Sequence, residues 1–214
     1  MELIANKICK EIRGKTVLSD IELCLCSGNI YGFVGRNGSG KTMLFRALSG
    51  LMTVDSGEIT LEGKKLHKDF SVLPSLGIVL ENAGLFPGMT GMQNLTYLAE
   101  LRHRIGTEEI RQAISRVGLD PRDKRPYSKY SLGMKQRLVI AQAIMEKPDV
   151  IMLDEPTNAL DEAGVEEIRK LILEEKERGA LILLASHNKE DMRILADCLY
   201  RIDHGKVTLQ EEMI

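Results

Sequence analysis

The segment at positions 35–42 reads Gly35-Arg36-Asn37-Gly38-Ser39-Gly40-Lys41-Thr42. It matches the pattern G-x-x-x-x-G-K-[ST] at every fixed position. An apolar run, Ile30–Val34, precedes the segment, and a helical pattern begins near Lys41. Glycines let the backbone curl so that successive N–H groups point toward phosphate oxygens, and a helix N-terminus adds partial positive charge. The segment therefore predicts a loop that binds the phosphates of a nucleotide.

Two residues at the end of this loop carry side-chain chemistry. Lys41 can reach the β- and γ-phosphates, and the Thr42 hydroxyl can bind Mg²⁺. A chance match somewhere in the chain is roughly a 1% event, given that about 7% of residues are glycine. Kinases, GTPases and many motor proteins share such a loop, so the loop alone does not name the function.

Short apolar runs bounded by turn residues recur along the chain and alternate with helical patterns. Besides the run before the loop, they are Gly77–Leu80, Val150–Leu153, Leu181–Ala185 and Leu199–Ile202. This alternation predicts an α/β fold, a P-loop NTPase core with a mostly parallel sheet flanked by helices.

Two other segments break the alternation. Short alternating stretches in Glu2–Leu25, around a turn at Arg13-Gly14-Lys15, predict an N-terminal antiparallel β subdomain. Helical apolar spacing in Met92–Arg102 and Glu108–Val117 predicts a helical insertion, Gly88–Tyr130. We expect the 214 residues to form one domain that carries this insertion.

Two carboxylates follow the apolar run Val150–Leu153. In P-loop ATPases an Asp at the end of a buried strand holds Mg²⁺, so Asp154 is the candidate metal ligand. Glu155, the next residue, is placed to take a proton from an attacking water as a general base. Strands often end in acidic residues, but the phosphate loop earlier in the chain makes this pair informative.

Composition limits the cellular context. The net charge of −2 gives no basic field for non-specific binding to DNA or RNA, so we expect no nucleic-acid partner. No stretch approaches the roughly 18–20 apolar residues that span a bilayer, and Met1–Lys10 lacks the apolar core of a secretory signal. We therefore expect a cytosolic chain with four free, core-packed thiols, at Cys9, Cys24, Cys26 and Cys198.

Further motifs resemble one family, the ATP-binding proteins of ABC transporters. The segment resembling the family's LSGGQ signature, in the form YSxGMKQR, is Tyr130-Ser131-Leu132-Gly133-Met134-Lys135-Gln136-Arg137. Downstream, Asn158-Ala159-Leu160-Asp161 resembles the D-loop, and Ser186-His187 follows an apolar run as the switch histidine does. With the phosphate loop and Asp154-Glu155, the family's elements occur in order across nearly the whole chain.

The resemblance implies a composite site that binds ATP and Mg²⁺. Ser131 and Gly133 precede a helical run, Lys135–Met145, whose N-terminal end can bind a phosphate. In the family this end caps the γ-phosphate held by another chain, in an ATP-dependent, head-to-tail homodimer or heterodimer. The resemblance also implies that His187 contacts the γ-phosphate.

Several positions depart from the family pattern. Leu132 stands where the consensus has a glycine, and Glu81 stands where the family usually has the Q-loop glutamine; a carboxylate there can still bind Mg²⁺. Ile12 falls near the usual adenine-stacking aromatic. We expect Ile12 and the nearby Cys9 to serve packing.

These observations predict an ATPase subunit that powers a separate membrane permease from the inner face of the cell membrane. Coupling would pass through the Glu81 loop and the insertion. The signature form resembles those of bacterial exporters of antibiotics and lantibiotic peptides. Two alternatives stay open: a soluble ABC-type ATPase that acts on ribosomes or DNA, and an ATP-gated clamp without hydrolysis.

Overall fold

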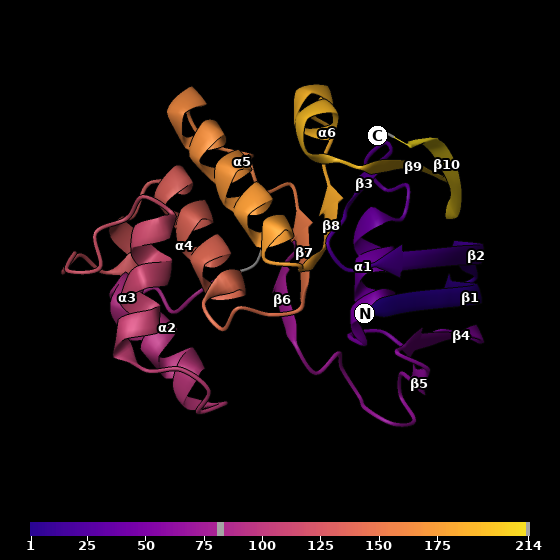
Figure 1. Cartoon of the computed structure of the whole chain (residues 1–214), viewed down its shortest axis with the longest axis horizontal. Helices are drawn as coiled ribbons and strands as arrows, with labels where there is room; N and C mark the ends of the chain where they lie inside the picture. Colours follow the sequence, from indigo (N-terminus) through magenta and orange to yellow (C-terminus); the bar gives the residue numbers. More distant parts are fainter. Residues whose placement is uncertain (81–83, 213–214) are drawn as a thin grey trace.

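The computed structural model describes residues 1–80 and 84–212, which form two sheets and the helices around them (Figure 1). One sheet is four-stranded and antiparallel, in the order β2-β1-β4-β5. Its strands are β1 (Glu2–Ile12), β2 (Lys15–Cys26), β4 (Ser56–Leu61) and β5 (Lys64–Lys65). This sheet confirms the predicted antiparallel N-terminal part and extends it, because β4 and β5 join from beyond the phosphate loop.

The second sheet has six strands in the order β10-β9-β3-β8-β7-β6. They are β3 (Ile30–Val34), β6 (Leu76–Val79), β7 (Val150–Asp154), β8 (Leu181–Ala185), β9 (Cys198–Asp203) and β10 (Lys206–Glu212). All neighbours pair in parallel except β9 and β10. Every residue of β7 and β8 is buried, which explains their continuous apolar runs. The predicted α/β class is confirmed.

Within residues 1–80 and 84–212, seven helical segments cover or flank these sheets. They are α1 (Lys41–Ser49), α2 (Gly91–Glu100), α3 (Thr107–Arg116), the 3₁₀ turn η1 (Tyr127–Lys129), α4 (Leu132–Ile144), α5 (Glu162–Glu177) and α6 (Lys189–Leu195). Figure 1 shows α2 and α3 at one end of the molecule and the four-stranded sheet at the other. The segment predicted as a helical insertion thus contains α2, α3 and η1.

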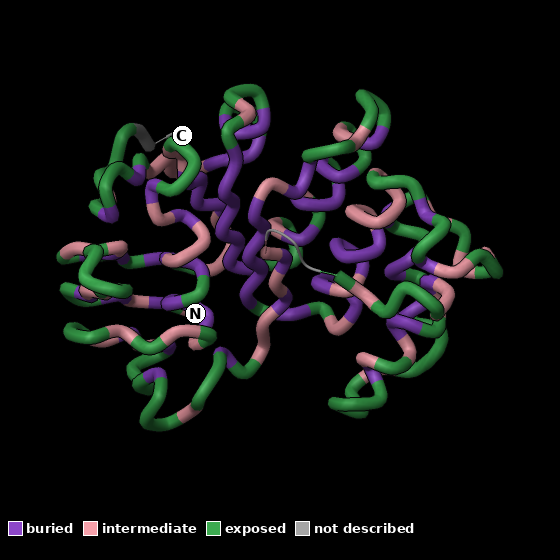
Figure 2. The backbone as a smooth tube through the Cα atoms, turned by 180° about the vertical axis from the view of Figure 1, so that it is seen from behind, coloured by how far each residue is buried: buried purple, intermediate pink, exposed green. Residues whose placement is uncertain are grey.

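Two apolar cores hold the elements in place, and Figure 2 shows the central strands as the most continuously buried part of the chain. The first core joins α1 to both sheets, with Phe33 of β3 and Phe45 of α1 in edge-to-face contact at 5.7 Å between ring centroids. The second core joins α2, α3, α4 and α5 to the other face of the six-stranded sheet. Because α1 is fixed on both sides, its N-terminus has a defined position.

Two expectations about packing were wrong. Ile12 is 37% exposed at the end of β1, because the hairpin turn carries it out of the core. Cys24 and Cys26 are exposed, because alternation along β2 gives the core face to Leu23 and Leu25 instead. All four cysteines are free thiols, as expected.

Candidate nucleotide site

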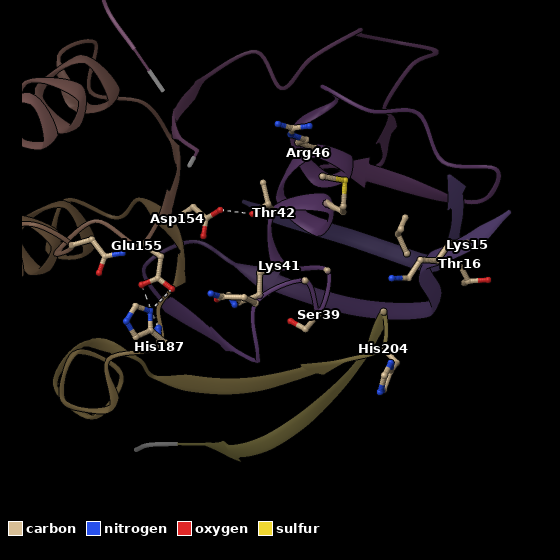
Figure 3. A pocket seen from close by; sticks show the side chains of 17 residues that line it. Lys15, Thr16, Ser39, Lys41, Thr42, Arg46, Asp154, Glu155, His187 and His204 are labelled. Carbon is tan, nitrogen blue, oxygen red and sulfur yellow. Dashed lines mark hydrogen bonds and ion pairs between the residues drawn. The ribbon is translucent and has the colours of Figure 1, made fainter. Parts of the chain in front are cut away.

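A pocket of about 520 Å³ lies where the two sheets meet α1 (Figure 3). The phosphate loop and the first turn of α1 form its floor, and the ends of β7 and β8 contribute one side. The start of β2 and the turn between β9 and β10 contribute the other side. Figure 3 shows Glu155 and His187 at one end and Lys15 and Thr16 at the opposite end.

The glycines of the phosphate loop are required by its geometry. Gly38 and Gly40 have φ angles of +77° and +117°, in the region that side chains with a Cβ rarely adopt. A Cβ on Gly35 would lie 2.3 Å from the Ile202 carbonyl oxygen and 2.6 Å from Ser39 Oγ. The loop can therefore form only with glycine at these positions, and it leads directly into α1 at Lys41.

The loop presents hydrogen-bond donors toward the pocket. Lys41 is 7% exposed, and its Nζ donates to the carbonyls of Gly35 at 2.7 Å and Arg36 at 3.4 Å. Ser39 is 8% exposed, and its hydroxyl has no hydrogen-bond partner among the described residues. A buried polar atom without a partner costs about 1–3 kcal/mol, so such an atom calls for a ligand. Phosphate oxygens fit both groups. Asn37 and Gly38 are exposed loop residues that also line the pocket, whereas Arg36 is exposed and is not among the lining residues.

Thr42 and Asp154 meet as the sequence predicts for a magnesium site. Thr42 Oγ1 donates a hydrogen bond to Asp154 Oδ2 over 2.6 Å, from the first turn of α1 to the end of β7. Asp154 is 5% exposed. A hydroxyl and a carboxylate oxygen beside a phosphate loop are the hard ligands that Mg²⁺ prefers, so the residues fit this ion. Glu81, the other predicted ligand, lies outside the described residues.

Glu155 and His187 contact each other at the ends of adjacent parallel strands. His187 Nδ1 lies 2.8 Å from Glu155 Oε1, and the Glu155 side chain is 15% exposed against 64% for His187. Glu155 has φ of 53°, an uncommon value for a residue with a Cβ, and its N–H donates to the Ala185 carbonyl at 2.8 Å. Such backbone conformations persist where the surroundings hold them, often at functional sites.

The signature segment lies outside this pocket. Ser131 is the N-cap of α4, its hydroxyl accepting from Met134 N at 3.2 Å, and both Ser131 and Leu132 are exposed. A Cβ on Gly133 would lie 2.9 Å from the Ala159 carbonyl oxygen, so the signature lies against the predicted D-loop. The structure thus does not bring Ser131 and Gly133 to the phosphate loop of the same chain.

Gln136, for which no role was predicted, links α4 to the turn that follows β7. Its Nε2 donates to the carbonyls of Glu155 at 3.3 Å and Pro156 at 3.2 Å. The residue stands within the quoted signature, so its place in the motif was the available signal.

Sequence reasoning also missed the far end of the pocket. Lys15, Thr16 and Val17 of β2 line it together with His204 and Gly205 of the β9–β10 turn. No local pattern marks these residues, because the pocket wall is created by the approach of one sheet to the other. Ile12, which falls near the family's usual adenine-stacking position, is not among the residues that line the pocket.

A buried ion-pair network lies behind the turn that follows Glu155. Thr157 Oγ1 donates to Asp191 Oδ2 at 2.5 Å, and Arg169 Nε donates to Asp191 Oδ1 at 2.9 Å. Thr157 is 7% exposed, Asp191 is 1% exposed and Arg169 is 4% exposed. Burial alone would lower the pKa of Arg169, but its hydrogen bonds with Asp191, Glu190 and Glu166 together outweigh burial, so the pKa is raised. The network ties the turn after Glu155 to α5 and α6.

Together, the two-sheet fold and this pocket define a phosphate-loop nucleotide-binding protein. Residues 18–158 match the family model described as ABC transporter, and the chain belongs to that family as an ATP-binding subunit. Among its relatives, YybJ of Bacillus subtilis, an uncharacterized ABC transporter ATP-binding protein, is 47% identical over 97% of this chain and 95% of its own length.

Two further comparisons extend this result. SrtF of Streptococcus pyogenes, a lantibiotic transport ATP-binding protein, is 34% identical over 92% of this chain and 85% of its own. A dimeric structure of MJ0796, a bacterial ABC transporter cassette, superposes with a TM-score of 0.90 at 21% identity and covers 99% of both chains. That likeness confirms the fold. Within the described part of the chain, the helices are too short or too polar to cross a membrane.

Proposed function

We propose that residues 1–214 act as one ABC ATPase domain that hydrolyses ATP and drives a separate membrane permease. The observation that carries the proposal is the contact between Glu155 and His187, beside the Thr42–Asp154 pair and at one end of the phosphate pocket. This arrangement puts a general base, a metal-binding pair and a phosphate loop within one pocket.

Each residue then has a defined role. Lys41 and the loop N–H groups hold the phosphates, while Thr42 and Asp154 hold Mg²⁺, which neutralises charge on the triphosphate when bound. Glu155 takes a proton from water as the water oxygen bonds to the γ-phosphorus, and the bond to the bridging oxygen of ADP breaks. His187 orients Glu155 through the 2.8 Å contact and can contact the γ-phosphate by rotating.

We assign the signature to a second chain. Ser131 and Gly133 lie at the N-terminal end of α4, exposed or half-exposed, and this end can donate backbone N–H groups to a phosphate. Because they lie outside their own chain's pocket, they are available to the pocket of a partner ATPase subunit, as a homodimer or a heterodimer. The dimeric structure of the MJ0796 cassette supports this arrangement.

The membrane assignment has support from the helical insertion. Phe86, which precedes α2, and Tyr97, on α2, are 46% and 43% exposed and meet edge-to-face at 5.2 Å between ring centroids. Exposed aromatic side chains of this kind are common at protein interfaces. We propose that they, with the Glu81 loop, receive the permease at the cytoplasmic face of the membrane. The name of SrtF supports a peptide antibiotic as the exported substrate.

A steady-state assay of phosphate release separates turnover from clamping. We expect ATP hydrolysis that requires Mg²⁺ and stops with a chelator. Tight ATP binding without phosphate release would instead favour the ATP-gated clamp.

Fractionation of cells that express the tagged full-length chain separates the permease from the soluble alternative. We expect the chain in the membrane fraction, and we expect Phe86→Asp with Tyr97→Asp to release it while purified ATP binding is unchanged. Recovery of the chain with ribosomes or DNA would contradict the transport proposal.

A further inference from the structure

A second cluster of reactive side chains lies on the outer face of the four-stranded sheet. Cys24 and Cys26 are on β2, and Glu2, on β1, is the cross-strand partner of Cys26. All three are exposed, and their two sulfurs and a carboxylate oxygen lie within 4.8 Å of one another. Alternation along the strands turns Leu23 and Leu25 into the core and leaves the thiols together outside.

We propose that Glu2, Cys24 and Cys26 bind a thiophilic divalent cation of the zinc class. Zinc lies about 2.3 Å from thiolate sulfur and about 2.0–2.2 Å from carboxylate oxygen, so tetrahedral ligand atoms are separated by about 3.6–3.8 Å. The observed separations, up to 4.8 Å, exceed this spacing by about 1 Å at most, a difference that rotation of the exposed side chains can remove. Two thiolates and a carboxylate leave a fourth position for water, which exposure of the site permits.

Without a cation, a hydrogen bond joins the Cys24 thiol to the Glu2 carboxylate. Cys24 Sγ donates to Glu2 Oε1 at 3.0 Å. Binding of a divalent cation would release one proton from each thiol to solvent, without any change in oxidation state.

A disulfide is the other chemistry open to two neighbouring thiols, and the strand geometry disfavours it. Residues i and i+2 of a strand have Cα atoms about 6.4–6.8 Å apart, at the upper end of the range for disulfides. Their Cβ atoms point the same way, so they are not drawn toward the separation of about 3.8 Å that the bond requires. A bridging cation tolerates the wider spacing.

The surrounding charge favours a cation. A groove on the same face is lined by Cys24, Glu22 and Glu58. Lys65 neutralises Glu58, whereas Glu2 adds its own negative charge to the cluster. Clefts lined by one sign of charge raise the local concentration of the opposite ion.

The cluster is separate from the nucleotide pocket. The pocket is lined by Lys15, Thr16 and Val17 at the start of β2, whereas Cys24 and Cys26 are near its end. Nine residues of extended strand separate Lys15 from Cys24 by about 30 Å. Metal binding therefore needs no nucleotide.

The test titrates Cd²⁺ into the reduced, nucleotide-free full-length protein, following the ultraviolet charge-transfer absorption of Cd²⁺–thiolate bonds, and then displaces it with Zn²⁺. We expect one Cd²⁺ per chain. Cys24→Ser or Cys26→Ser should weaken binding at least about tenfold, and the double variant should abolish it. Glu2→Gln removes the third ligand and should weaken binding at least about tenfold, since even groups that only orient metal ligands contribute that much. Cys9→Ser, a matched control elsewhere on the same sheet, should bind as the parent does.

Three results would overturn the proposal: no charge-transfer absorption in the parent, absorption that persists in the Cys24→Ser/Cys26→Ser variant, or loss of two hydrogens in mass through a Cys24–Cys26 disulfide under mild oxidation with no metal bound. ATP binding of each variant checks that it is folded. Because the titration omits nucleotide and the ATPase assay omits thiophilic metals, failure of one leaves the other proposal standing.

Discussion

Replacing Arg169 by Met tests the buried ion-pair network behind the turn that follows Glu155. Asp191 is 1% exposed and accepts hydrogen bonds from Arg169 and Thr157. Met has a similar length without charge, so the variant leaves the Asp191 carboxylate buried with the Thr157 hydroxyl as its remaining partner in this network. Breaking a buried pair in this way costs about 3–5 kcal/mol. The contacts of Arg169 with the exposed Glu166 and Glu190 add little, since surface ion pairs contribute about 0–1 kcal/mol.

This loss in the free energy of unfolding corresponds to a measurable decrease in Tm. For a domain of 150–250 residues, 1 kcal/mol shifts Tm by about 2–4 °C, so we expect Arg169→Met to lower Tm by about 6–20 °C. Calorimetry of the nucleotide-free chain is the assay. Arg122→Met is the matched control, because Arg122 and Asp120 are 90% and 61% exposed at 3.6 Å and should shift Tm by no more than about 4 °C.

A second variant separates loss of the pair from loss of packing. Arg169→Met with Asp191→Leu removes both charges, and replacing a buried ion pair by apolar residues is often neutral. We expect the double variant to regain most of the lost stability. If the Tm of Arg169→Met equals that of the Arg122→Met control, the network does not stabilise the fold and the reasoning fails.

Two further predictions concern the nucleotide. Lys41→Ala removes at least one charge-assisted hydrogen bond worth about 1.5–3 kcal/mol, so ATP affinity should fall at least about 10- to 150-fold in equilibrium binding. Unchanged affinity would mean that Lys41 does not reach the phosphates. Ile12→Tyr should tighten ATP more than GTP, by the order of 1 kcal/mol for an added aromatic stack, because Ile12 pairs across the hairpin with Lys15, which lines the pocket. Equal tightening of both nucleotides, or of neither, would place Ile12 away from the base.

The parts of the fold that follow local patterns could be predicted from the sequence. The runs that became β3, β7 and β8 are buried on both faces, so their residues are apolar without interruption. The loop at 35–42 has glycines where φ is positive or where a Cβ would collide with Ile202. Such constraints act within a few residues and leave a readable pattern.

The contacts between distant segments could not be predicted in the same way. Nothing in the sequence near Lys15 or His204 indicates that they line one pocket, because that wall depends on how the two sheets pack. Arg169 lies on α5 and Asp191 lies on α6. From sequence alone, a charged residue on a helix is expected at the surface. Their burial follows from the folded arrangement, in which Arg169 and Thr157 both donate hydrogen bonds to Asp191.

The exposed thiols show the same limit. Free cysteines are common in cores, so packing was the expectation for Cys24 and Cys26. The register of β2 against β1 puts Glu2 beside them on the outer face. The pairing along the eleven residues of β1 has several register shifts, so this register could not be read from the sequence.

The measurement that tests the central claim most directly is gel filtration of Glu155→Gln with ATP and Mg²⁺, together with its rate of hydrolysis. Removing the base should slow hydrolysis by about 10²- to 10⁴-fold without removing ATP binding. The lost negative charge beside the triphosphate should also favour closure, so we expect a dimer that survives the column. Adding Ser131→Arg should abolish that dimer, because a bulky cation would block the end of α4. Hydrolysis of ATP by Glu155→Gln at the parent rate, or a trapped dimer that Ser131→Arg leaves intact, would contradict the account.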